Sequence, residues 1–300
     1  MNIIKFTELL DSEPTLDNLL KECNIPINSG DKIHKEYNLI SELNKVVGDI
    51  EKVHKFRVAH NAKNEIEFAL FDLVLISYCA EFLKKCNKSI LKKKLKDILE
   101  ISDPSTENTL NNAGRNTLFE LLFYSYLQSV GIDCELCDPN PDITAKFGSR
   151  KYFIQCKRVF SENGKAIRSN VLSALKQVNN DLNEKDENNL GIMALSVERF
   201  FTGGNKMLVV ETEEIAKKEL NNNLKSIVNK YGRYWQDKSL IIDKRIVAVF
   251  LHHLAITYVL EQPRISVGHF ILMNNTIYPE TDNFIQASND FRCLYSLMAP

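Results

Sequence analysis

The sequence predicts an α/β protein in which a helical N-terminal part precedes a core of mixed helices and strands. Two observations support this prediction. The first hundred residues carry apolar side chains at helical spacing, and the next hundred give the order helix, three strands, helix, strand. A chain of 300 residues with 44% apolar content can fill one large or two medium domains. We place the domain boundary between residues 1–105 and 106–300.

The N-terminal part contains three segments with helical periodicity, at residues 34–52, 65–85 and 90–99. Its last turns are rich in lysine: Lys84, Lys85, Lys88, Lys92, Lys93, Lys94 and Lys96. This cluster is either a basic surface that faces phosphates or the solvated face of a helix, and both interpretations stay open. The polar segment 102–116 contains Pro and Gly and has no apolar period, so it predicts a connector.

The core begins with an apolar helix predicted over 117–130, where Gly131 stands in the position of a helix C-cap. Turn residues then separate short strand candidates, and a helix, a strand and further elements follow. The expected strands are 133–137, 142–147, 151–160, 191–197 and 269–273, and the expected helices are 167–182 and 214–234. The long apolar segment 245–259 fits either a buried strand or a buried helix.

Four polar residues of this core form an ordered set. Glu120 lies on the first helix, Asp142 follows Pro141, and the third strand carries Gln155 and Lys157. Strand alternation places Gln155 and Lys157 on one face, and a hairpin of the second and third strands brings Asp142 beside them. Carboxylates bind the hard cation that polarises a phosphoryl oxygen and lowers the pKa of the attacking water. The set therefore predicts a metal-dependent site that cleaves phosphodiesters.

This pattern resembles the PD-(D/E)xK nuclease superfamily, which has a restriction-endonuclease-like αβββαβ core. The two signatures correspond to Pro141-Asp142 and to Gln155-Cys156-Lys157, and the resemblance covers roughly residues 112–200. The run of residues 152–158 is similar to restriction nucleases of the methyl-directed kind. The resemblance implies a DNA endonuclease that depends on Mg²⁺ (or Mn²⁺) and acts in restriction or defence.

The resemblance also implies roles for individual residues. Asp142 would be the principal metal ligand, with Glu120 and the main-chain carbonyl of Cys156 as further ligands, and Lys157 would be the catalytic lysine. Gln155 departs from the usual acid, and a neutral amide is a weaker ligand for a hard dication. Arg158, Lys165 and Arg168 flank the proposed site, where they either hold the nucleic-acid backbone or are exposed solubilising charges. The resemblance adds Gln177, because some relatives carry a helix Gln that points toward the site. The tyrosine expected four residues after Gln177 is replaced by Asp181.

Each member of the set has a simpler explanation. Glu120 follows Thr117 at the spacing of a capping box, Asp142 suits an ordinary turn, and Lys157 suits a solvated strand end. A rival hypothesis is a catalytically inactive nuclease scaffold that binds DNA or assembles with a partner. RNA or a branched junction remains an alternative substrate. The resemblance also implies a homodimer, with segment 245–259 either at the subunit interface or in the core of one chain.

Composition narrows the class of protein. A formal net charge of −1 argues against wrapping by nucleic acid, so a polyanion site must be local. We expect a cytosolic protein with no membrane segment and with seven reduced cysteines.

Cys134 and Cys137 lack a second ligand pair for zinc, and His252 and His253 suit hydrogen-bonded core positions. The chain has neither a phosphate-binding Gly loop nor the Ser elbow of hydrolases.

Overall fold

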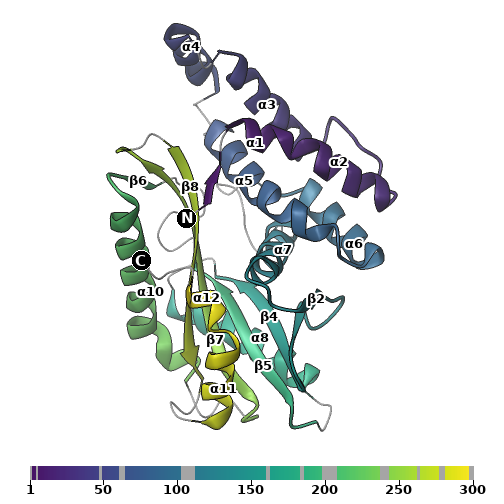
Figure 1. Ribbon diagram of the computed structural model, residues 1–300, viewed down its shortest axis with the longest axis vertical. Coiled ribbons are helices and arrows are strands. Elements are labelled where there is room, and N and C mark those ends of the chain that lie inside the picture. Colours follow the sequence, from purple (N-terminus) through teal and green to yellow (C-terminus); the bar gives the residue numbers. More distant parts are fainter. Residues whose placement is uncertain are drawn as a thin grey trace.

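The computed structural model describes most of the chain (Figure 1). The described ranges are 2–4, 6–46, 49–60, 65–102, 112–159, 163–182, 186–197, 208–236, 243–261, 264–276 and 281–296. The α-helices are α1 (Phe6–Asp11), α2 (Glu13–Glu22), α3 (Lys32–Val46), α4 (Ile50–His60), α5 (Glu65–Leu83), α6 (Lys88–Leu99), α7 (Ala113–Ser129), α8 (Gly164–Asp181), α10 (Glu213–Tyr231), α11 (Asp282–Asp290) and α12 (Cys293–Ser296). The strands are β1 (Asn2–Ile4), β2 (Cys134–Leu136), β3 (Ile143–Phe147), β4 (Arg150–Arg158), β5 (Asn189–Ser196), β6 (Leu208–Val210), β7 (Ile246–Val259) and β8 (Arg264–Asn275).

The strands of the described residues form one mixed sheet of eight strands. Its order is β1-β8-β7-β5-β4-β3-β2, and β6 pairs with β7 outside this path. β3 and β4 form an antiparallel hairpin that ends at the pair Ile143 and Ile154, while β4 runs parallel to β5. Helix α8 makes the crossover between the two parallel strands, as such a connection requires.

Helices cover both faces of the sheet. The side chains of β4 alternate between two apolar clusters, because Ile154 and Cys156 pack with α7 whereas Phe153 packs with α8 and α10. Figure 1 shows α10 along one side of the sheet and the helices of residues 6–99 gathered at one end of the molecule. This three-layer arrangement gives the mixed α/β architecture that the sequence predicts.

The N-terminal helices pack on α7. Helices α5 and α6 both contact it, and one apolar cluster runs from Leu9 through α7 to Leu294. The predicted domain boundary falls in the segment 103–111, which lies outside the described residues. Helix α7 is therefore shared, since it covers the sheet with one side and holds the N-terminal helices with the other.

The predicted core elements are confirmed in type and order, from α7 through β2, β3, β4 and α8 to β5. Gly131 has a φ of 82° after the end of α7, as a C-cap glycine requires. The capping-box interpretation of Glu120 is wrong, because α7 begins at Ala113 and Thr117 lies inside it. The ambiguous segment 245–259 is strand β7, whose residues 246–253 are buried in the core.

A buried network of charges joins α3, α5 and α7. Arg115 donates two hydrogen bonds to Asp72, at 2.8 and 2.9 Å, and both side chains are almost fully buried. Lys32 lies 3.4 Å from Asp72 and 3.4 Å from Glu36. Burial, and then the charge of Asp72, raise the pKa of Glu36 well above its ordinary value of 4.5, although Lys32 and Arg115 oppose this shift.

The substitution Glu36→Gln is expected to make stability less dependent on pH. Because the pKa of Glu36 is higher in the folded than in the unfolded chain, its contribution is complete below about pH 4.5 and is lost as the pH rises. The free energy of unfolding of the variant should therefore exceed that of the wild type increasingly above this pH. Urea unfolding across pH 4 to 9, with the exposed Glu81→Gln as control, measures the difference. A constant difference would contradict the prediction.

Candidate functional site

Asp142 lies where the β3–β4 hairpin opens. The regular ladder ends at Ile143 and Ile154, and beyond it the main-chain N–H of Cys156 donates to Oδ2 of Asp142 at 2.7 Å. The carboxylate thus accepts the hydrogen bond that a main-chain carbonyl of the neighbouring strand accepts in a regular ladder. Since the N–H and C=O of one strand residue point to the same edge, the carbonyl of Cys156 also lies on the Asp142 side. Asp142 is 7% exposed, so it is more deeply placed than an ordinary turn acid.

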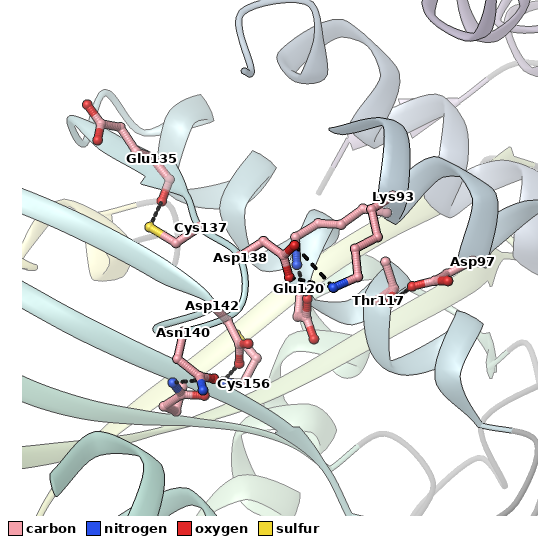
Figure 2. A network of polar contacts seen from close by, with 12 residues as sticks. Lys93, Asp97, Thr117, Glu120, Glu135, Cys137, Asp138, Asn140, Asp142 and Cys156 are labelled. Atoms are coloured by element: carbon pink, nitrogen blue, oxygen red, sulfur yellow. Dashed lines mark hydrogen bonds and ion pairs between the residues drawn. The ribbon is translucent and has the colours of Figure 1, made fainter. Parts of the chain in front are cut away.

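Glu120 approaches the same place from α7. Its Oε2 accepts a hydrogen bond from Nζ of Lys94 on α6 at 2.5 Å, and both side chains are mostly buried. Figure 2 shows Asp142 between Glu120 on one side and Asn140 and Cys156 on the other. Helices from two distant parts of the chain therefore meet the end of the hairpin.

The charges of this cluster perturb one another. Burial, and then the negative charge of Glu120, raise the pKa of Asp142 to about 7, against the hydrogen bond from Cys156 and the charges of Lys157 and Lys94. Burial lowers the pKa of Lys94, but the attraction and hydrogen bond to Glu120, together with Asp142, outweigh burial and raise it. The structure therefore holds two carboxylates and two ammonium groups close enough to interact.

Gln155 lies on the opposite face of β4 from Cys156. It is fully buried, and its Nε2 donates to Oδ2 of Asp181 at 2.9 Å and approaches Oδ1 of Asn140 at 3.4 Å. Its Oε1 is buried and has no hydrogen-bond partner within the described ranges. Asp181 is the residue that stands four after Gln177 on α8. The amide nitrogen of Gln155 is thus committed, and its carbonyl oxygen is left available.

The remaining predicted residues divide by exposure. Lys157 is half-buried and, by strand alternation, shares the face of Gln155. Arg158 is 6% exposed, so a merely solubilising charge is excluded there, whereas Lys165 and Arg168 are exposed on the first turns of α8. Gln177 keeps a buried Oε1 with no hydrogen-bond partner among the described residues.

These oxygens fit a hard divalent cation in chemical type. Such cations bind carboxylate, amide and main-chain carbonyl oxygens, which Asp142, Glu120, Gln155 and Cys156 supply. The mutual repulsion of the two carboxylates is what a bound cation would relieve. The buried, unpartnered Oε1 of Gln155 is a further oxygen of the type that such a cation binds. Within the described part of the chain, no three His, Cys, Asp or Glu residues are grouped as metal ligands. The set therefore depends on the neutral oxygens as well as on two acids.

Lys94, Asp181 and Asn140 were not assigned to the site from the sequence. Lys94 stands three residues after Leu91 and four before Ile98, which puts it on the apolar face of α6, and this spacing was the available signal. The cluster interpretation treated all seven lysines alike. The contacts of Asp181 and Asn140 with Gln155 depend on the packing of α8 and of the loop before β3, which no local pattern encodes.

Other polar residues of the sequence lie elsewhere. His252 and His253 on β7 are both fully buried, and His252 packs beside Phe119 and Phe123 of α7. Burial lowers the pKa of His253 to about 4. Cys134 and Cys137 are both unpaired, and burial raises the pKa of each thiol.

Among the helices of the described residues, none combines the length and the apolar character needed to cross a bilayer. Comparisons of the chain with family models, with curated proteins and with solved structures find no match.

Proposed function

We propose that this protein is a divalent-cation-dependent DNA endonuclease that hydrolyses phosphodiester bonds at the site around Asp142. The observation that carries the proposal is the meeting of Asp142 and Glu120 with the ammonium groups of Lys157 and Lys94 at the open end of the β3–β4 hairpin. Opposed carboxylates and ammonium groups suit the joint binding of a cation and a phosphate.

Each residue has a chemical task in this proposal. Asp142 and Glu120, with the carbonyl oxygens of Cys156 and Gln155, would hold Mg²⁺ or Mn²⁺, which supplies a polarised phosphoryl oxygen and an acidified water. Lys157 would stabilise the charge that develops on the phosphate. Asp181 and Asn140 orient the amide of Gln155 through its nitrogen, so the side chain stays in one rotamer with its oxygen free to bind a cation.

The substitution Lys157→Met is expected to slow cleavage by about 10²-fold or more, since it removes one ammonium beside the reacting phosphate. The measurement is conversion of supercoiled plasmid to nicked and linear forms in Mg²⁺ or Mn²⁺. Lys146→Met is the matched control, because Lys146 lies on the neighbouring strand and pairs with exposed Glu135. Equal rates in both variants would remove Lys157 from the site.

The wild type should also be tested on linear duplex, branched DNA and RNA, which separates the substrate classes. If the wild type cleaves none of these substrates, the proposed activity is overturned and the rival hypothesis, a protein without catalysis, remains.

The rival is a nuclease-fold protein without catalysis that binds DNA or assembles with a partner. The observation in its favour is that Lys94 already neutralises Glu120, while Gln155 replaces the usual acid. An inactive scaffold should take up Mn²⁺ negligibly in a calorimetric titration, whereas the proposed enzyme should bind it. The two candidates are thus separated before any substrate is tested.

A further inference from the structure

Helix α6 touches the candidate site at three positions. Lys93 lies 2.8 Å from Oδ1 of Asp138 in the loop that leads to Asp142. Lys94 forms the ion pair with Glu120, and Asp97 accepts a hydrogen bond from Thr117 one turn earlier on α7. Figure 2 shows Lys93 beside Asp138 and Asp97 beside Thr117. The helix therefore holds both the loop before Asp142 and the segment of α7 that carries Glu120.

Two adjacent lysines of α6 differ sharply in environment. The side chain of Lys93 is 63% exposed, whereas that of Lys94 is 8% exposed. An exposed ion pair such as Lys93–Asp138 contributes little, because water and salt screen it. The buried ammonium of Lys94 acts on Glu120, and its charge also reaches Asp142. Of these two lysines of α6, Lys94 is the one inside the cluster of carboxylates.

We propose that Lys94 is a positioning residue of the cation site. Its ammonium is the internal counter-ion of Glu120 and Asp142, holds the Glu120 carboxylate in place, and competes with the divalent cation for it. The inference rests on the proposed function, because it concerns the same cation site. It makes α6, a helix of the N-terminal part, the element that sets cation affinity.

The charge balance gives the direction of the effect. With Asp142 ionised, Glu120 and Asp142 contribute two negative charges, and Lys94 and Lys157 contribute two positive ones. A dication that enters this set must displace Lys94 from Glu120 and is repelled by its ammonium. Removing Lys94 takes away the competitor, while it leaves Glu120 without its partner in the cation-free protein.

The test compares Mn²⁺ binding by Lys94→Met, Lys93→Met and the wild type, at one pH and ionic strength. The electron paramagnetic resonance signal of free Mn²⁺ reports binding without any substrate. Lys94→Met should bind Mn²⁺ about tenfold more tightly or better, because a unit charge near a dication is removed. Lys93→Met should stay within about twofold of the wild type. Lys94→Arg keeps the charge, so it should bind Mn²⁺ about as weakly as the wild type does.

Thermal unfolding of each variant in a chelator establishes that it is folded. In Mn²⁺ the rise of the midpoint should be larger for Lys94→Met than for the wild type, as tighter binding requires. If the Met variant does not fold, Lys94→Gln removes the charge and keeps a hydrogen-bond donor, and the same tightening is expected.

Two results would overturn the inference, and they differ in what else they remove. Mn²⁺ binding by folded Lys94→Met that is equal to or weaker than that of the wild type removes the role of Lys94 and leaves the cation site intact. Absence of Mn²⁺ binding in the wild type and in all variants removes the inference together with the proposed function.

Discussion

The substitution Asp142→Asn is expected to abolish cation-dependent cleavage and, at the same time, to stabilise the cation-free protein at pH 8. Asn keeps the size of Asp, and its carbonyl oxygen can still accept the hydrogen bond from Cys156. It removes a negative charge that is buried beside Glu120. A residue whose removal stabilises a fold and ends its activity is retained for function rather than for stability.

The pKa of Asp142 gives the sign and the pH window of this effect. Burial and Glu120 raise that pKa from 3.8 to about 7 in the folded chain. The stabilising contribution of the protonated group is complete below about pH 3.8 and is lost as the pH rises through about 7. One pKa unit corresponds to about 1.4 kcal/mol. Because the introduced Asn no longer attracts Lys94 and Lys157, part of this energy is lost, and we expect the free energy of unfolding to rise by about 1–3 kcal/mol above pH 7.

Urea unfolding of Asp142→Asn and wild type in a chelator, from pH 4 to 8.5, measures the gain. The curves should nearly coincide at pH 4 and separate as the pH rises. Asp138→Asn is the matched control, because this carboxylate lies in the same loop but is more exposed and is paired with Lys93. A loss of stability at pH 8 in Asp142→Asn, or retained plasmid cleavage, would count against the assigned role.

The substitution Arg115→Met is expected to destabilise the protein by about 3–5 kcal/mol. Arg115 on α7 makes a bidentate pair with Asp72 on α5, and its Nε donates to the carbonyl of Ser102 at 2.7 Å. Methionine fills most of the volume, but it leaves Asp72 charged, buried and close to Glu36. Lys32 still lies 3.4 Å from Asp72, but this partly exposed ammonium does not replace the two buried hydrogen bonds of Arg115. Breaking a buried pair by removing one partner costs far more than the pair contributes.

A double-mutant cycle with Asp72→Asn tests this reason. The double variant Asp72→Asn with Arg115→Met should be more stable than Arg115→Met alone, because the buried carboxylate that lost its arginine is removed as well. Arg150→Met is a comparison from the same protein, since Arg150 pairs with Asp290 but is 30% exposed, and it should cost about 1 kcal/mol. Equal losses for the two arginines would show that burial does not govern the effect.

The order of elements in residues 113–196 could be predicted because it is encoded locally. β4 carries a short run of aromatic and apolar residues that follows a turn, apolar side chains recur at helical spacing through α8, and Gly131 ends α7 with the positive φ that its position requires. The hairpin of β3 and β4 follows from short strands and a turn. Segment 245–259 could not be assigned, because a continuous apolar run fits a buried strand and a buried helix equally.

The candidate site was predicted in part. Glu120, Asp142 and Lys157 were singled out by type and order, and the structure brings their charges within reach of one another. Neither interpretation of the lysine cluster, a basic surface or a solvated helix face, separates Lys94 from its neighbours, although Lys93 is exposed and Lys94 is not. Adjacent residues of a helix point to different faces, so the spacing of α6 can indicate that Lys94 faces the core. It cannot indicate the partner, because Glu120 belongs to another helix.

The sequence by itself determined the element types within residues 113–196, the alternation that puts Gln155 and Lys157 on one face of β4, and the end of α7, because these depend on neighbours within a few residues. Only the tertiary structure decided that α6 packs on α7 with Lys94 against Glu120, that Asp181 holds Gln155, and that the carboxylate of Asp142 replaces a strand acceptor at Cys156. The physical reason is that burial and partner, which set the charge state of a side chain, come from segments far apart in the chain.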